Sequence, residues 1–261
     1  MIMYRACFGL IGYPLSHSFS KTYYINKFEQ EGIKDMGYEL YPLSSIQVFS
    51  QLIQQHSNLM GVNVTIPYKV AVLPFIDELS PEAKAIGAVN CIRIHRSTDG
   101  QTFLSGYNTD VYGFSESLKP LLKPEHTQAL VLGNGGAARA VCYALEQLGI
   151  DFLVACRQFR EEFSNQIHFE ELNNDLLAQY KLIINTTPLG TFPKVEEAPA
   201  IPYEALTSAH LLYDLIYNPE ETAFLKAGRE RGATIKNGYE MLVFQAEKNW
   251  DIWMADEADK K

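Results

Sequence analysis

The sequence predicts an α/β protein with two domains. A β-type apolar run, a glycine turn and a helix-forming run follow one another directly between Ala129 and Ala144, and the residues before them alternate between strand-like and helix-like segments. Such alternation favours largely parallel sheets covered by helices. The 261 residues exceed one typical domain and can bury two cores. We therefore expect a mainly parallel α/β domain, followed by a second domain that begins near the glycine turn.

Apolar periodicity and turn residues locate the elements in order. Before the glycine turn, the expected strands are residues 4–11, 38–41, 59–65, one ending at His95, and 102–107. The expected helices there are residues 20–31, 46–56, one starting near Ser80 and one ending at Leu122. From the turn onward, the expected strands are 130–132, 152–156, 181–185, 211–216 and 234–236, with helices at 137–148 and 241–255.

Composition narrows the class of partner. The net charge of −9 argues against a basic nucleic-acid-binding or membrane-binding face, so we expect a small-molecule partner. Cys7, Cys91, Cys142 and Cys156 show neither C-x-x-C nor metal-ligand spacing, which predicts free thiols and no metal site. No run reaches the roughly 20 apolar residues of a membrane helix, and the first apolar run is too short for a secretion signal. A cytoplasmic protein is expected.

The glycine turn carries a dinucleotide-binding pattern. Gly133, Gly135 and Ala138 match G-x-G-x-x-G/A, and Gly136 and Ala137 open the helix behind it. The first glycine allows a tight turn, the second lets the backbone approach a pyrophosphate, and the small third residue allows close packing. Phosphates would bind at the positive end of the helix dipole. The alternative is a glycine turn in another kind of α/β protein.

The next strand bears on the choice of cofactor. An NAD site tends to place an acidic residue at the end of this strand, for the ribose hydroxyls. Here the strand ends in Cys156 and Arg157, and Arg160 follows before the first acid, Glu161. Arginine suits a 2′-phosphate, so we expect NADP, used as NADPH. The alternative is a solvated basic loop.

Polar residues also follow the strands of the first half. Ser18 and Ser20 lie between a strand and a helix, where they could cap the helix or bind a carboxylate; His17 beside them could be a simple loop residue. Lys69 follows a strand and Pro67, which suits a first helical turn. A lone lysine is usually a surface residue. Asp110 could likewise be only a helix cap.

Eight motifs combine these pieces. They include G-x-P-x-x-H-S-x-S, N-V-T-x-P-x-K, G-A-V-N and G-x-N-T-D-x-x-G before the glycine turn. The turn itself is G-x-G-G-A-x-R-A, and N-T-T-P-x-G, Y-D-x-x-Y-x-P-x-x-T-x-F-L and N-G-x-x-M-L-x-x-Q follow it. In this order and over nearly its full length, the chain resembles the shikimate dehydrogenase family.

The resemblance implies a role for individual residues. The implied catalytic pair is Lys69 and Asp110. The implied shikimate-binding residues are Ser18, Ser20 and Tyr217 for the carboxylate, and Thr65, Asn90 and Gln245 for the hydroxyls. The implied cofactor-binding residues are Gly133, Gly135, Gly136, Ala137, Arg157, Leu215 and Gly238.

The resemblance also implies an activity and a domain layout. The activity is reversible reduction of 3-dehydroshikimate to shikimate with NADPH, in a monomer or homodimer. Residues 1–110 would bind substrate, 111–237 would form a Rossmann-type NADP domain, and 238–261 would form a helix returning to the first domain. There are two alternatives. One is a quinate/shikimate dehydrogenase that uses NAD, and the other is a cofactor-binding sensor that has lost turnover. Departures from the family pattern are Cys91, Cys156, Gln158, Thr191, Glu240 and a shortened loop after Arg157.

Overall fold

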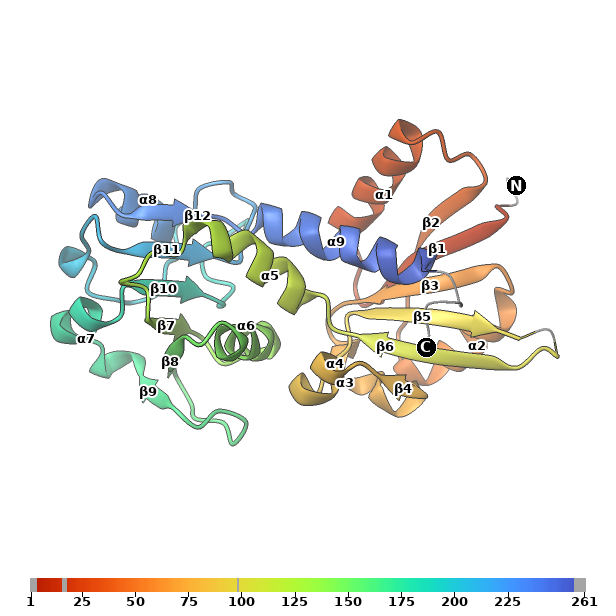
Figure 1. Ribbon diagram of the computed structural model, residues 1–261, viewed down its shortest axis with the longest axis horizontal. Helices are drawn as coiled ribbons and strands as arrows, with labels where there is room; N and C mark the ends of the chain where they lie inside the picture. The colour runs from red at the N-terminus through yellow and green to blue at the C-terminus, as the bar shows by residue number, and fades with distance from the viewer. Residues whose placement is uncertain (1–3, 16–17, 98, 256–261) are drawn as a thin grey trace. The chain divides into compact units, whose positions relative to one another are not determined.

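The computed structural model describes residues 4–15, 18–97 and 99–255. The chain forms two compact units, and each is a layered α/β structure (Figure 1). Unit 1 comprises the residues up to Thr109 together with those from Ala246 onward, and unit 2 comprises Asp110–Gln245. The predicted α/β class with mainly parallel sheets is confirmed. No helix in the described part of the chain has the length and apolar character needed to cross a membrane.

Unit 1 contains one six-stranded sheet. Its strands are β1 (Ala6–Gly12), β2 (Met36–Pro42), β3 (Leu59–Val64), β4 (Glu78–Leu79), β5 (Cys91–Arg96) and β6 (Thr102–Tyr107). The order is β2-β1-β3-β5-β6-β4, and β5 runs antiparallel to both of its neighbours. The other five strands therefore share one direction. As a result, the carboxyl ends of β1, β3 and β6 and the amino end of β5 meet at one edge.

Short helices complete unit 1. They are α1 (Phe19–Gln30), α2 (Phe49–Gln55), α3 (Tyr68–Ala71) and α4 (Pro81–Ile86), with 3-10 turns η1 (Ile46–Val48) and η2 (Leu73–Phe75). Residues 46–55 are thus a 3-10 turn followed by a helix, where we expected one helix. Pro67 precedes α3 at its N-cap position and does not lie in the first turn as expected. Ser80 caps α4 as expected, since its Oγ accepts a hydrogen bond from the Ala83 N–H at 3.2 Å.

The last helix contributes to both units. Helix α9 (Tyr239–Met254) passes from unit 2 into unit 1 at Ala246. In unit 1, the Trp253 ring stacks on Phe8 with centroids 4.8 Å apart, and its Nε1 donates to the Ile92 carbonyl at 3.0 Å. A Cβ at Gly61 would lie 2.3 Å from Trp253 Nε1, so only glycine lets the helix approach the sheet here.

Unit 2 contains an all-parallel six-stranded sheet. Its strands are β7 (Gln128–Leu132), β8 (Asp151–Cys156), β9 (Gln166–His168), β10 (Leu182–Asn185), β11 (Leu211–Asp214) and β12 (Thr234–Lys236). The order β12-β11-β10-β7-β8-β9 is that of the doubly wound dinucleotide-binding fold. The chain order reverses between β7 and β10, where such folds bind ligands at the carboxyl ends of the strands.

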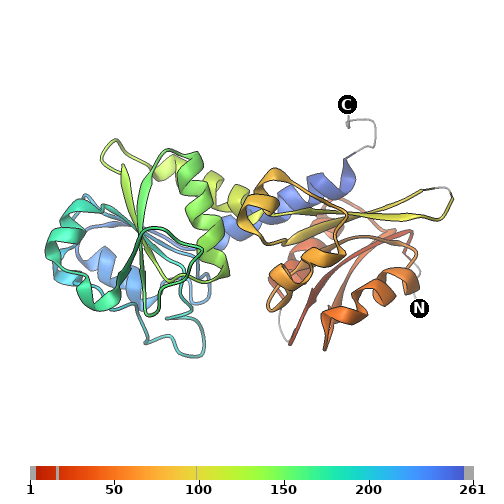
Figure 2. The ribbon, with the colours of Figure 1, turned by 90° about the horizontal axis from the view of Figure 1, so that it is seen from below.

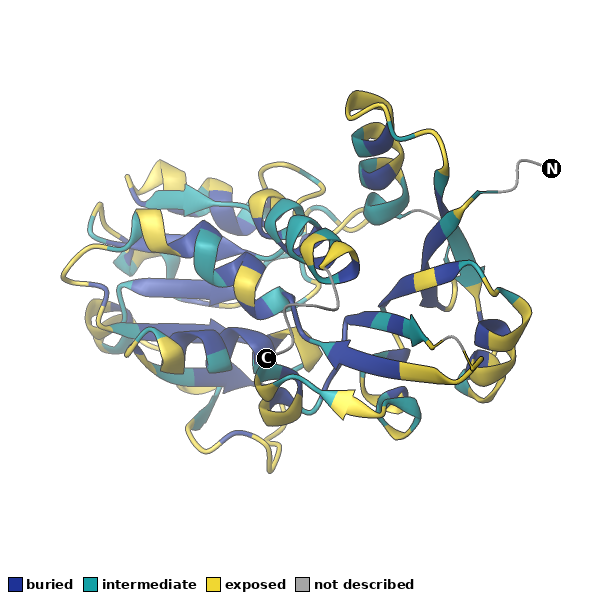
Figure 3. Ribbon diagram, turned by 45° about the vertical axis from the view of Figure 1, so that its right-hand side comes forward, coloured by how far each residue is buried: buried dark blue, intermediate teal, exposed yellow. Residues whose placement is uncertain are grey.

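Helices cover both faces of the unit 2 sheet (Figures 1 and 2). They are α5 (Asp110–Leu118), α6 (Gly136–Gln147), α7 (Asn174–Gln179) and α8 (Ala223–Glu230), with 3-10 turns η3 (Lys119–Leu121), η4 (Phe169–Glu171) and η5 (Tyr203–Ala205). The expected helix to Leu122 therefore ends at Leu118. The central strands of this sheet are mostly buried (Figure 3). Four elements of the two units were not expected from the sequence: β4, β9, α7 and α8.

Candidate active site

The edge of the unit 1 sheet gathers the polar loops. Ser18 and Ser20 follow β1, and Thr65 and Lys69 follow β3. Asn90 immediately precedes β5, whose reversed direction brings its amino end to the same edge. β6 ends at Tyr107, and the chain then continues through Asn108 and Thr109 to Asp110. Four segments distant in sequence thus leave one edge of one sheet.

The serine segment is both a helix cap and a polar surface. Ser18 is the N-cap of α1, where its Oγ accepts from the Lys21 N–H at 3.2 Å, so the capping alternative holds for this residue. A capping hydroxyl keeps its own hydrogen for another acceptor. Ser20 lies inside the first turn, and its side chain hydrogen bonds to the buried Tyr38. His17 lies outside the described residues.

A buried chain of amides continues from this serine. The Tyr38 hydroxyl donates to Asn63 Oδ1 at 2.7 Å, and Asn63 Nδ2 donates to the Asn90 carbonyl at 3.4 Å. Burial raises the pKa of Tyr38 well above its ordinary value, which keeps its hydroxyl protonated as a donor. Sequence reasoning assigned no role to Tyr38 or Asn63, although Asn63 begins one of the motifs.

Lys69 is anchored through its backbone. Its carbonyl accepts from the Val89 N–H at 2.8 Å, which joins the segment after β3 to the one before β5. The Tyr68 N–H donates to the Thr65 carbonyl at 2.9 Å, and the Tyr68 hydroxyl donates to the Leu43 carbonyl at 2.5 Å. Lys69 itself is half-buried. The short α3 is thus held on both sides, and Lys69 with it.

Asn90 and Thr109 lock the next two segments together. Asn90 is 3% exposed, and its Oδ1 accepts from the Thr109 N–H at 2.8 Å and the Thr109 hydroxyl at 3.2 Å. The same hydroxyl lies 2.6 Å from Oδ1 of the buried Asn249 in α9. Asp110 follows directly as the first residue of α5, so it lies in the helix and is not its cap. These contacts of Thr109 therefore fix the backbone that leads into Asp110.

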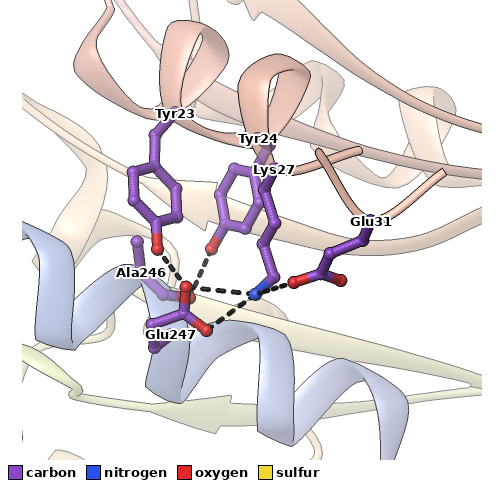
Figure 4. A network of polar contacts seen from close by, with 6 residues as sticks. All are labelled: Tyr23, Tyr24, Lys27, Glu31, Ala246 and Glu247. Carbon is purple, nitrogen blue, oxygen red and sulfur yellow. Dashed lines mark hydrogen bonds and ion pairs between the residues drawn. The ribbon is translucent and has the colours of Figure 1, made fainter. Parts of the chain in front are cut away.

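Helix α1 is also bound to α9 (Figure 4). Lys27 Nζ lies 2.8 Å from Glu247 Oε2 and 2.8 Å from Glu31 Oε1, and Tyr23 donates to Glu247. The Tyr24 hydroxyl donates to the Ala246 carbonyl at 2.7 Å. Burial disfavours the charged form of Lys27, but its bonds to the two carboxylates are stronger and raise its pKa. These contacts hold the helix that presents Ser18 and Ser20.

The carboxyl edge of the unit 2 sheet collects the second group of predicted residues. The glycine turn follows β7, Arg157 follows β8, Leu215 and Tyr217 follow β11, and Gly238 follows β12. All of these strands are parallel, so the segments leave the same edge.

The glycine turn fits a dinucleotide phosphate. Gly133 has φ +98°, which favours glycine, and a Cβ there would lie 2.9 Å from Thr187 Cγ2. Gly135 is the N-cap of α6 with no side-chain cap, and a Cβ at Gly135 or Gly136 would meet nothing within 4 Å. The first turn thus has no side-chain cap, and Gly136 and Ala137 are exposed at the positive end of the helix dipole. Arg157 and Arg160 are exposed on the loop after β8, and Arg160 lines a shallow hollow with Phe159, Glu161 and Glu162.

Leu215 and Gly238 are in close contact. A Cβ at Gly238 would lie 2.1 Å from the Leu215 carbonyl oxygen, and the Gly238 N–H donates to the Ile216 carbonyl at 3.0 Å. Tyr217, two residues beyond Leu215, is 40% exposed. Glycine at position 238 is therefore a steric requirement of the turn that precedes α9.

A buried carboxylate supports these strand ends. Asp214 is fully buried at the end of β11 and accepts from Asn185 Nδ2 at 3.0 Å, the Ile216 N–H at 3.0 Å and the Thr222 hydroxyl at 2.6 Å. Asn185 Oδ1 in turn accepts from the Thr187 N–H at 3.0 Å. The sequence motifs contained these residues, but we assigned them no role. They link the loops after β10 and β11.

Gln245 lies on α9 and is 7% exposed. Its Nε2 donates to the Leu242 carbonyl at 3.0 Å. A Cβ at Gly113 would lie 2.4 Å from the Met241 carbonyl oxygen and 3.1 Å from Gln245 Cβ. The second glycine of the G-x-N-T-D-x-x-G motif thus allows α5 to pack closely against the turn of α9 that carries Gln245.

Known proteins resemble this chain in sequence. Residues 10–92 match the family profile described as the shikimate dehydrogenase substrate binding domain. A shikimate dehydrogenase (NADP(+)) from Carboxydothermus hydrogenoformans is 39% identical over 260 residues, covering 94% of this chain and 90% of the relative. The chain belongs to the shikimate dehydrogenase family.

Solved structures of similar proteins have the same fold. The shikimate 5-dehydrogenase of Thermus thermophilus, solved in complex with NADP(H) and shikimate, is 31% identical with a TM-score of 0.82, covering 96% of this chain and 94% of that one. The quinate dehydrogenase of Corynebacterium glutamicum, in complex with NAD, is 28% identical with a TM-score of 0.83, covering 97% and 94%. The recognition of the family from its motifs is confirmed.

Proposed function

We propose that this chain catalyses the reversible NADPH-dependent reduction of 3-dehydroshikimate to shikimate. The observation that carries the proposal is the convergence of the segments bearing Ser18 and Ser20, Lys69, and Asn90 at one sheet edge, within a chain of this family. The printed activity of the relatives, shikimate dehydrogenase (NADP(+)), supports the same choice of substrate and cofactor.

In this proposal, residues 1–110 and the C-terminal segment 238–261 supply most of the groups that hold the substrate. Ser18, Ser20 and Tyr217 bind the carboxylate of shikimate, since hydroxyl groups near a helix N-terminus are good partners for an anion. Thr65, Asn90 and Gln245 bind its hydroxyls. An amide nitrogen such as Asn90 Nδ2 is a donor suited to a substrate hydroxyl oxygen.

Residues 111–237 hold the cofactor, with Gly238 just beyond them. The N–H groups of the turn at Gly133, Gly135, Gly136 and Ala137 bind the pyrophosphate, and Arg157 binds the 2′-phosphate. Leu215 and Gly238 form the wall for the nicotinamide. When bound, NADPH supplies the hydride that reduces the ketone. The bare backbone at Gly135 and Gly136 and the exposed Arg157 support this assignment.

Lys69 and Asp110 perform the proton chemistry. Negative charge develops on the ketone oxygen during reduction, and the Lys69 ammonium stabilises that charge and donates a proton to the oxygen. In the reverse direction, neutral Lys69 accepts the proton of the shikimate 3-hydroxyl. The Asp110 carboxylate orients the ammonium and a substrate hydroxyl.

The cytoplasmic location and the state as monomer or homodimer stay predictions.

The activity is tested with four combinations of substrate and cofactor. We expect reduced cofactor to form fastest from shikimate with NADP⁺, and more slowly from shikimate with NAD⁺ or from quinate with either cofactor. A preference for quinate and NAD⁺ would assign the chain to the quinate/shikimate dehydrogenases. Binding of NADP⁺ without turnover on any substrate would make it a sensor.

The acid–base roles are tested with Lys69→Ala and Asp110→Asn. Loss of the proton donor should lower kcat by about 10² to 10⁴ while leaving the fold intact. Asp110→Asn should slow turnover through loss of its negative charge. Lys84→Ala, at an exposed lysine in α4, is the matched control and should retain full activity. Near-normal kcat in Lys69→Ala would contradict the mechanism even if shikimate proved to be the substrate.

A further inference from the structure

One side chain organises the exposed loop after β8, which carries Arg157 and Arg160. Gln166, the first residue of β9, faces back onto this loop. Its Oε1 accepts from the Arg160 N–H at 2.9 Å, and its Nε2 donates to the carbonyls of Arg160 at 2.7 Å and Phe163 at 2.8 Å. The side-chain amide thus pairs with both backbone polar groups of Arg160, as a neighbouring strand would.

The same amide connects the loop to the glycine turn. Asn134, between Gly133 and Gly135, donates its Nδ2 to the Gln158 carbonyl at 2.7 Å and to Gln166 Oε1 at 3.3 Å. The backbone at position 160 is therefore held at a defined position relative to the turn that fits a pyrophosphate. A primary amide has two donor hydrogens and two acceptor lone pairs, and the contacts of Gln166 engage both ends of the group.

We propose that Gln166 is a positioning residue that sets the preference of this site for a 2′-phosphorylated adenosine, acting through Arg160. The proposal rests on the proposed function, because it takes the loop after β8 as the 2′-phosphate site. Arg160 contributes its charge only when its backbone is held in place. Gln166 provides that restraint in a loop that has no regular secondary structure between β8 and β9.

Loss of the Gln166 side-chain amide should weaken ligand binding more than folding. The loop is mostly exposed, so the backbone groups released by loss of the amide can hydrogen bond to water, and the cost to stability is small. The guanidinium of Arg160 instead loses its defined position. A phosphate contact should therefore weaken in a variant that still folds.

The test is calorimetric titration of the full chain with adenosine 2′,5′-bisphosphate and with 5′-AMP. Gln166→Met keeps the side-chain volume and removes its hydrogen bonds. We expect this variant to bind the bisphosphate about ten-fold more weakly, as for loss of a charge-assisted bond. Its affinity for 5′-AMP should fall by less than about two-fold, as for a surface substitution. The melting temperature should change by less than about 3 °C. Gln179→Ala, which removes an exposed amide of the same unit, is the control and should change neither affinity.

Arg160→Ala and the double variant test the route of the effect. If Gln166 acts through Arg160, the double variant should bind the bisphosphate no more weakly than Arg160→Ala alone. Independent, additive losses would overturn the proposal. Should the methionine variant melt early, Gln166→Asn replaces it, since its shorter neutral side chain cannot reach the same backbone groups of Arg160, and the same non-additivity is expected.

The wild-type titrations keep the two proposals distinguishable. Tighter binding of the bisphosphate than of 5′-AMP, retained in Gln166→Met, would overturn the role of Gln166 and leave the proposed NADP function standing. Equal binding of both nucleotides by the wild type would overturn both proposals. Turnover of shikimate is not required for either result.

Discussion

Asp214 is a single carboxylate on which two loops of unit 2 depend. Burial raises its pKa to about 6, although its bonds from Thr222, Ile216 and Asn185 act in the opposite direction. A folded-state pKa above the unfolded value means that the folded chain takes up a proton between roughly pH 4 and pH 6. The contribution of this group to stability is therefore greatest below pH 4 and is lost as the pH rises through 6.

We predict that Asp214→Asn has a pH-dependent effect. The substitution removes the cost of the buried charge, so the stability of the variant relative to wild type should improve by about 2 kcal/mol between pH 4.5 and pH 7.5. Other titrating groups cancel in this difference. Urea unfolding of both proteins at the two pH values measures it. A difference that is constant with pH would mean that Asp214 does not titrate in this range.

Gly238 shows how a backbone contact restricts a residue. We predict that Gly238→Ala destabilises the protein by about 3 kcal/mol, because the new Cβ would overlap the Leu215 carbonyl oxygen. Gly136→Ala is the control, since its Cβ meets nothing within 4 Å, and it should raise the unfolding free energy by no more than about 1 kcal/mol. Thermal unfolding compares the two variants. Equal melting temperatures would show that the turn before α9 can relax.

At the scale of elements, α1 depends on α9 for its place in unit 1. Glu247 on α9 accepts from Tyr23 and Lys27 of α1. Burial acts to raise the pKa of Glu247, but the bonds from Lys27 and Tyr23 prevail and lower it. The folded-state pKa is thus depressed, so this contribution to stability is present above the unfolded pKa of about 4.3 and is lost as the pH falls through the folded value.

We predict that Glu247→Gln weakens the contact between the two helices. The side chain of Glu247 is 40% exposed, so solvent screening limits the loss to about 0.5–1 kcal/mol. Because α1 presents Ser18 and Ser20, KM for shikimate should rise while KM for NADP⁺ stays constant. Glu31→Gln, which removes the other partner of Lys27, should leave both KM values unchanged. A parallel rise in both KM values would argue against a local effect on α1.

At the scale of the molecule, the chain passes between its two units at Thr109–Asp110 and at Gln245–Ala246. Unit 1 is therefore discontinuous in sequence, and its core is completed by residues of α9. The aromatic contacts of Trp253 with Phe8 and Tyr24 are part of the unit 1 core. Unit 1 cannot acquire this core before Trp253 is made.

We predict that Trp253→Ala separates the two binding activities. Removal of a buried tryptophan should destabilise unit 1 by about 3–5 kcal/mol. Calorimetry should then show loss of shikimate binding, with binding of adenosine 2′,5′-bisphosphate by unit 2 retained. Met254→Ala, at an exposed neighbouring residue, is the control. Loss of both ligands together would mean that the units fold as one cooperative block.

Local patterns were sufficient for much of this molecule. Residues 102–107 and 234–236 are strands with the expected bounds, and α6 begins at Gly136, one residue before expectation. These elements follow from side-chain periodicity, β-branched runs and glycine turns, which act over a few residues. Helix α8 carried comparable signals, a Thr222 cap before Phe224 and Leu225, although it was not expected. The motifs, with their order and spacing, also predicted the family.

The positioning contacts were decided by tertiary structure alone. The antiparallel direction of β5 brings Asn90 to the site edge, and it depends on pairing with strands elsewhere in the chain. The Thr109–Asn249 contact spans 140 residues, and the two-residue β4 exists only because it pairs with β6. Gln166 likewise gave no signal, since its partners lie in a loop and a turn upstream. Side-chain periodicity reports burial along one segment, whereas hydrogen-bond partners from distant segments are chosen only when the sheets assemble.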